Sequence, residues 1–143
     1  MISVYLEKLT DMLNFEYTGC LIFDEHTVYE DEVIAYLDAG NEGNSTPYDE
    51  AGVHTPTSRS KEYHIARVVW FVRHQDEIRG ISVDNLCDNN HIYPTIVIKD
   101  GYHRFMAARI CKMDKIKVEY KGREDVERYL QGRKKTPPKK AIR

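Results

Sequence analysis

The spacing of apolar residues changes several times along the chain, and each change marks an expected element. Apolar positions recur every three or four residues, as in helices, over 1–13, 27–40, 60–78, 102–113 and 123–131. Short strand patterns cover 17–23, 81–83, 95–98 and 115–120, and the last of these alternates cleanly. Helices and strands are interleaved, so we predict an α+β domain with a small mixed β-sheet flanked by helices.

Local residues refine some of these boundaries. Thr27 and Glu30 have the spacing of a capping box, and Ser60 suits the N-cap of the helix over 60–78. On that helix, His64, Arg67 and His74 lie off the apolar stripe and are expected on the solvated side; the alternative is that they face the ligand. The polar stretch 84–91 is expected to be a connection that follows the strand over 81–83.

Two segments lack the residues for a core. The stretch 41–60 is rich in Asn, Gly, Ser, Thr and Pro, so we expect a long loop, and an insertion is favoured over a lid. The basic stretch 133–143 contains two adjacent prolines and is expected to be a disordered tail. The prediction is therefore one domain over 1–132, followed by that tail.

The stretch 93–109 combines a strand, a turn and a helix start. Residues 95–98 are β-branched, as in a central strand buried on both faces, and Asp100-Gly101 is a turn signal before the helix that begins at Tyr102. Free backbone N–H groups at a helix start favour anions, and the arginine fork matches phosphate oxygens. We therefore expect a phosphate-binding corner at Gly101, Tyr102, His103 and Arg104. The alternative is a plain tight turn in which Arg104 pairs with a carboxylate.

The segment IVIKDGYHRFMAARICKMDKIKV resembles the core of the ParB/sulfiredoxin superfamily, over about Gly80 to Tyr120. The resemblance implies that Gly101 and Arg104 contact nucleotide phosphates, with His103 beside them. Tyr102 stands where sulfiredoxins carry a reactive cysteine, so sulfiredoxin chemistry is not expected. Too few residues follow Tyr120 for the helix-turn-helix region of partition proteins, so we expect a stand-alone domain.

Composition sets further bounds. The net charge is −2, with 41% hydrophobic and 31% charged residues, as in soluble globular proteins. The chain has no apolar run of membrane-spanning length and no secretion signal at its start, so no membrane partner is expected. The three cysteines form no C-x-x-C pair, which favours reduced thiols and a cytoplasmic location. Six of the 21 basic residues lie in 131–143 with no acid, so the body is acidic and the tail basic.

The chemistry left open falls into three classes. The sequence has no H-E-x-x-H, no Cys/His ladder, no P-loop and no G-x-G-x-x-G, so no metal ligands are predicted. Asp100 and His103 are the candidate catalytic residues. The first class is a domain that binds a nucleotide (ATP or CTP class, with Mg²⁺) or a phosphorylated small molecule, with NTPase or phosphotransferase activity. The second is a nucleic-acid-binding protein or nuclease that uses the same corner and the basic tail. The third is an interaction protein that has lost its ligand.

Overall fold

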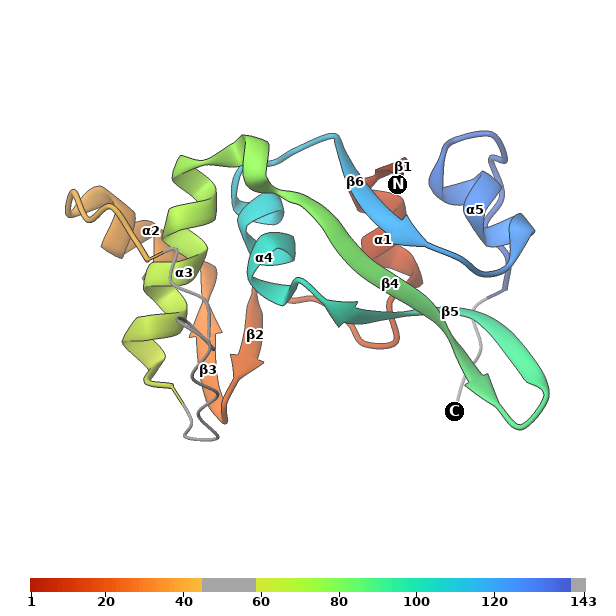
Figure 1. Cartoon of the computed structure of the whole chain (residues 1–143), viewed down its shortest axis with the longest axis horizontal. Coiled ribbons are helices and arrows are strands. Elements are labelled where there is room, and N and C mark those ends of the chain that lie inside the picture. The colour runs from red at the N-terminus through yellow and green to blue at the C-terminus, as the bar shows by residue number, and fades with distance from the viewer. Residues whose placement is uncertain (45–58, 140–143) are drawn as a thin grey trace.

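The computed structural model describes residues 1–44 and 59–139 (Figure 1). Its elements are, in chain order, β1 (Ile2–Tyr5), α1 (Leu6–Met12), β2 (Cys20–Phe23), β3 (His26–Tyr29), α2 (Glu30–Asp38), α3 (Lys61–Arg73), the 3-10 turn η2 (Gln75–Glu77), β4 (Arg79–Asp88), β5 (His91–Asp100), α4 (Tyr102–Ile110), β6 (Lys115–Tyr120) and α5 (Glu124–Leu130).

The main sheet is mixed, as predicted. Its four strands lie in the order β1-β6-β4-β5, where β4 and β6 are parallel and the other neighbours are antiparallel. Strands β2 and β3 form a separate two-stranded ribbon. With the surrounding helices this makes one small α+β domain, which confirms the predicted fold class.

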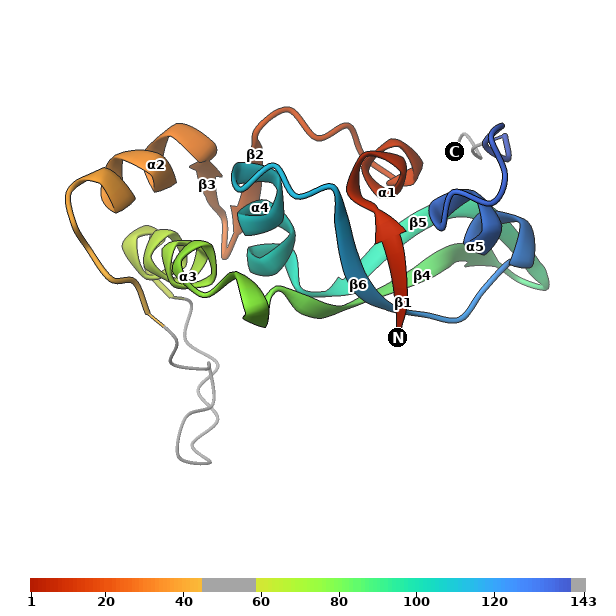
Figure 2. The same cartoon turned by 90° about the horizontal axis from the view of Figure 1, so that it is seen from above.

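The core lies between the main sheet and the helices on one of its faces. Figure 2 shows α1 and α4 on the same side of the sheet. Strand β6 buries every second residue and exposes its lysines and Glu119 on the other face, which confirms its predicted alternation. The residues that fill the core between sheet and helices include Leu9, Ile81, Ile96, Phe105, Met106 and Val118.

The joint between β5 and α4 forms at Gly101, as predicted. Its φ of 108° is a left-handed conformation that glycine adopts without the clash that a Cβ brings. A Cβ at this position would also lie 3.1 Å from a side-chain atom of Ile81. The turn is therefore tight enough to place the first residues of α4 directly beside β4.

The expected helix over 1–13 is wrong for its first third. Residues 2–5 form β1, because they pair antiparallel with 115–118 of β6 at the edge of the main sheet. The helix begins only at Leu6. Helical spacing over so few residues is compatible with both structures, and the unpaired edge of β6 decides in favour of the strand.

The strand that contains 95–98 is not central. It belongs to β5, which lies at the edge of the main sheet, paired only with β4. The segment after α1 covers part of this edge: the Asn14 N–H donates to the Ile96 carbonyl oxygen at 2.9 Å, and Leu13 forms a bridge with Ile96. This cover explains why Thr95 and Ile96 are nonetheless almost fully buried.

The polar stretch 84–91 is a hairpin rather than an irregular connection. Residues 84–88 continue β4, the chain turns at Asn89 and Asn90, and β5 begins at His91. The paired backbone outweighs the polar composition, because cross-strand hydrogen bonds do not require apolar side chains. In Figure 1 this hairpin extends beyond the rest of the sheet.

Two helix boundaries also differ from the prediction. Thr27 is in β3, and the next helix, α2, begins at Glu30, where the Tyr29 N–H donates to the Glu32 carboxylate at 3.0 Å. The helix expected over 60–78 ends at Arg73 and is followed by η2. Its predicted start is confirmed, because the Ser60 hydroxyl accepts the Tyr63 N–H at 3.1 Å.

Most of the predicted 41–60 loop and the last four residues of the predicted tail lie outside the described residues. Within the described ranges, none of the helices combines the length and apolar character that a bilayer crossing requires. All three cysteines are unpaired.

Candidate anion and histidine site

The start of α4 presents backbone donors without a side-chain cap. The Phe105 N–H donates to the Gly101 carbonyl oxygen at 2.8 Å across the joint. The N–H groups of Tyr102, His103 and Arg104 precede this bond, and no side chain caps the helix. Such a helix start favours a negative charge, through these donors and through the helix dipole.

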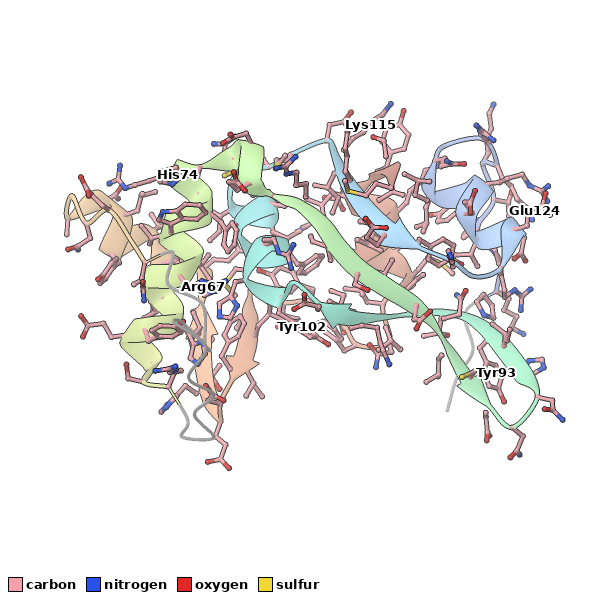
Figure 3. All side chains as sticks on the ribbon, in the orientation of Figure 1. Arg67, His74, Tyr93, Tyr102, Lys115 and Glu124 are labelled. Atoms are coloured by element: carbon pink, nitrogen blue, oxygen red, sulfur yellow. The ribbon has the colours of Figure 1, made fainter. Side chains whose placement is uncertain are left out.

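A hollow of about 280 Å³ lies at this helix start. Its walls come from β2, α3, the end of β5 and the first turn of α4. They carry three cationic side chains and one carboxylate, together with aromatic surfaces: Phe23, Arg67, Phe71, Lys99, Asp100, Gly101, Tyr102, His103 and Arg104. Figure 3 labels two of these residues, Arg67 on α3 and Tyr102 at the start of α4. The excess of positive charge and the backbone donors together suit an anionic ligand.

Arg104 is held by two contacts. Its guanidinium donates to the Arg79 carbonyl oxygen at 2.7 Å and to the Asp100 carboxylate at 3.2 Å. The carboxylate partner predicted under the plain-turn alternative is therefore present. The Asp100 side chain is 78% exposed, and such an exposed pair contributes little to stability. Arg104 thus lines the hollow while its fork is oriented by the backbone of β4.

His103 belongs to a chain of three hydrogen-bonded side chains. Its Nε2 lies 2.9 Å from Nδ1 of His64 on α3, and Nε2 of His64 lies 2.7 Å from the carboxylate of Asp24. Asp24 lies in the turn between β2 and β3, and its carboxylate also accepts the Arg59 N–H at 3.0 Å. Three elements far apart in sequence therefore meet at His103. We call Asp24, His64 and His103 the histidine chain.

Phe23 supports both imidazoles. Its ring stacks on His103 with centroids 4.2 Å apart and on His64 with centroids 5.1 Å apart. The two imidazole planes are within 16° of parallel. Because ring lone pairs lie in the imidazole plane, this arrangement suits the hydrogen bond between them.

Burial sets the protonation states in the histidine chain. It lowers the pKa of His103 to about 3, and the nearby charges of Arg67 and Arg104 act in the same direction. Burial also lowers the pKa of His64, although Asp24 opposes this effect. Hydrogen bonds from the Arg59 backbone and from His64 lower the pKa of Asp24. At neutral pH the histidine chain therefore consists of one carboxylate and two neutral imidazoles.

The turn that carries Asp24 is strained. Asp24 and Glu25 have φ values of 49° and 69°, a left-handed conformation that costs residues with a Cβ about 1–2 kcal/mol each. Two-residue hairpin turns of this type favour glycine in the second position, where this chain has Glu25. Strain of this kind often accompanies functional sites, and here the turn delivers a carboxylate to His64.

All five predicted site residues, Asp100 to Arg104, border the hollow. Sequence reasoning missed Asp24 and His64, and it placed His64 on the solvated side of α3, which is wrong because His64 is only 1% exposed. A signal was present: His64, Val68 and Phe71 follow the spacing of one helical stripe, so the histidine shares a face with apolar residues. Asp24 gave no signal, since it lies in a short turn.

Among the described residues, no group of three or more His, Cys, Asp or Glu side chains has the arrangement of a metal site. Comparison with protein-family models, with curated proteins and with solved structures finds no match for this chain.

Proposed function

We propose that this domain binds a nucleotide, or another phosphorylated molecule, with a phosphate group at the start of α4. The observation that carries the proposal is the uncapped helix start at the edge of a hollow that also holds Arg67, Lys99 and Arg104. Neutral donors and fixed cations together recognise phosphate oxygens in proteins. The resemblance of the Asp100–Arg104 turn to the ParB/sulfiredoxin core agrees with this function.

The size of the hollow bears on how a nucleotide would bind. Its volume of about 280 Å³ is at the lower limit of small-molecule pockets, which span roughly 300–1,000 Å³. A phosphate group fits inside such a space. Because both histidines are neutral, the attraction for the phosphate comes from Arg67, Lys99 and Arg104.

Calorimetry and thermal-shift measurements with ATP, ADP, CTP and GTP, each with Mg²⁺, test the proposal. A ligand that binds the native state raises the melting temperature by mass action. In the Arg104→Ala variant we expect roughly ten- to a hundredfold weaker binding, because a charge-assisted bond contributes about 1.5–3 kcal/mol. The Lys99→Ala variant should weaken binding in the same direction.

Arg128→Ala is the matched control. Arg128 forms the same kind of exposed pair with a carboxylate four residues earlier, Glu124, but it lies on α5. Its removal should leave nucleotide affinity unchanged. Affinity that is unaffected by Arg104→Ala and Lys99→Ala contradicts the phosphate site at the start of α4. The absence of binding for all four nucleotides contradicts the nucleotide as its ligand.

A further inference from the structure

A second cavity lies at the end of α4, opposite the hollow at its start. Its volume of about 490 Å³ is within the range of small-molecule pockets, roughly 300–1,000 Å³. Its walls come from the start of α1, the start of α2, the last turn of α4 and the connection to β6. Figure 1 and Figure 2 both show α4 between α1 and α2, so three helices border this space. We call it the α4-end cavity.

Charged side chains of both signs line the α4-end cavity. They are two cations, from the last turn of α4 and the turn after it, and three carboxylates: Arg109, Lys112, Glu7, Glu30 and Asp114. A ligand with several negative charges would face the three carboxylates, and a polyamine would face the two cations. The lining therefore suits a ligand that carries one charge of each sign.

Some of these charges are engaged only in part. Nη1 of Arg109 donates to the Glu7 carboxylate at 2.8 Å and to the Thr10 hydroxyl oxygen at 3.4 Å. Glu7 is 78% exposed, so its pair with Arg109 contributes little. In the described part of the chain, Nη2 of Arg109 has no hydrogen-bond partner, and neither Lys112 nor Asp114 forms an ion pair. Two cationic groups and a carboxylate therefore remain available for a ligand.

Glu30 is held in place by a tyrosine. The Tyr17 hydroxyl donates to one of its oxygens at 2.5 Å, and the Arg109 guanidinium lies 5.6 Å from the centre of the Tyr17 ring. Burial raises the pKa of Tyr17, and the bond to Glu30 acts in the same direction, so the hydroxyl stays a donor at neutral pH. A carboxylate and a guanidinium are thus both held by Tyr17 at the edge of one cavity.

Apolar side chains complete the lining. Leu6 is almost fully buried, and Met113 is partly buried against the core. An apolar group placed on these side chains is removed from water, which favours binding. The cavity therefore has a place for three groups of a ligand: an anion, a cation and an apolar chain.

We propose that the α4-end cavity binds a free α-amino acid with an apolar side chain, which carries one charge of each sign at neutral pH. Its carboxylate contacts Arg109 and Lys112. Its ammonium group contacts Glu30 and Asp114, and its side chain lies on the apolar lining. This site is separate from the phosphate corner and does not depend on the proposed function.

Calorimetry with leucine, methionine and phenylalanine tests the site, and we expect at least one of them to bind. For the one that binds most tightly, two probes each lack one charge: its amide has no carboxylate, and its deaminated acid has no ammonium group. Each probe should bind at least about tenfold more weakly than the amino acid, because it loses charge-assisted hydrogen bonds. Probes that bind as tightly as the amino acid overturn the recognition of both charges.

Two variants locate the two ends of the ligand, and both replace exposed side chains, so the fold should be retained. Lys112→Gln should weaken binding of the amino acid about three- to tenfold. It should change the affinity of the amide by less than about twofold, because the amide has no carboxylate for Lys112 to contact. Asp114→Asn should in the same way weaken the amino acid and spare the deaminated acid. Lys117→Gln and Glu119→Gln, on the opposite face of the main sheet, are the matched controls and should leave every affinity unchanged.

The outcomes are distinct from those of the nucleotide experiments. Arg104→Ala should leave amino-acid affinity unchanged, because Arg104 lies at the other end of α4. No binding of any of the three amino acids in the millimolar range overturns the inference and leaves the proposed function standing. Binding that neither Lys112→Gln nor Asp114→Asn alters would place the ligand elsewhere and also overturns the inference.

Discussion

The domain contains two polar clusters whose members come from distant parts of the chain, and they differ in what their side chains contact. In the histidine chain, the contacts run from a turn carboxylate through two imidazoles to the edge of a hollow. In the second, which we call the asparagine cluster, Oδ1 of Asn85 accepts from the Tyr120 hydroxyl at 2.6 Å and from the Arg123 N–H at 3.0 Å. Its amide nitrogen donates to the Pro94 carbonyl at 3.3 Å.

The asparagine cluster is a closed structure. Two of its three contacts end on backbone groups, and burial raises the pKa of Tyr120 to about 12, so it has no proton to exchange near neutral pH. Gly122 packs directly against the cluster, because a Cβ at this position would lie 2.1 Å from Oδ1 of Asn85. Buried hydrogen-bonded side chains are therefore not by themselves a sign of function. The histidine chain differs from the asparagine cluster because its titratable side chains extend to the edge of a hollow.

The largest predicted effect on stability is at the asparagine cluster. Asn85→Ala removes the acceptor for the Tyr120 hydroxyl and the Arg123 N–H. Each of these donors then loses a hydrogen bond at a site with little access to water. We expect a loss of about 2–4 kcal/mol in the free energy of unfolding, measured with denaturant. Tyr120→Phe, which leaves Asn85 bonded to Arg123, should cost about 1 kcal/mol. Equal, negligible losses in both variants would mean that the cluster does not stabilise the fold.

The next effect is the pH dependence that only the histidine chain should show. The pKa of His103 is about 3 in the folded state, against about 6.5 in the unfolded chain, so the unfolded chain binds more protons between these values. Stability therefore rises with pH across this window and falls on acidification. From about pH 7.5 to 5, His103 contributes a loss of at most about 2 kcal/mol. The lowered pKa of Asp24 acts in the same direction at lower pH.

Denaturant unfolding at several pH values checks this dependence. His103→Asn should flatten the slope between pH 7.5 and 5, whereas Tyr120→Phe should retain it, because that change lies in the other cluster. A wild-type stability that is flat across this range would show that His103 is not neutralised by burial.

The smallest predicted effect is at the strained turn. Glu25→Gly relieves a left-handed conformation that costs about 1–2 kcal/mol and introduces the flexibility of glycine, which costs about 0.5–1 kcal/mol. We expect a net gain of about 0.5–1 kcal/mol in thermal or denaturant unfolding. Lys112→Gly, at a φ of 54° after α4, is the matched control and should give a similar gain. A loss of stability in Glu25→Gly alone would mean that the Glu25 side chain itself supports the turn.

The sequence was most informative where structure is local. The joint at Gly101 and the alternation over 115–120 depend on neighbouring residues, and both predictions are confirmed. The predicted helix over 1–13 is wrong for residues 2–5, because β1 forms only through pairing with β6, which lies far along the chain. The histidine chain could not be predicted for the same reason: Asp24, His64 and His103 are placed by a ribbon, a helix and a helix start that meet only after folding.

The pairing of β1 with β6 has a consequence for the order of folding. The β4–β5 hairpin joins adjacent segments, so closing it costs little chain entropy and it can form early. Strand β1 must instead wait for a partner from the far end of the described chain, and until then the outer edge of β6 stays exposed. The first strand to be synthesised is thus among the last strands of the main sheet to pair. A chain at this stage presents an unpaired strand edge, which is the feature most prone to pairing with another molecule.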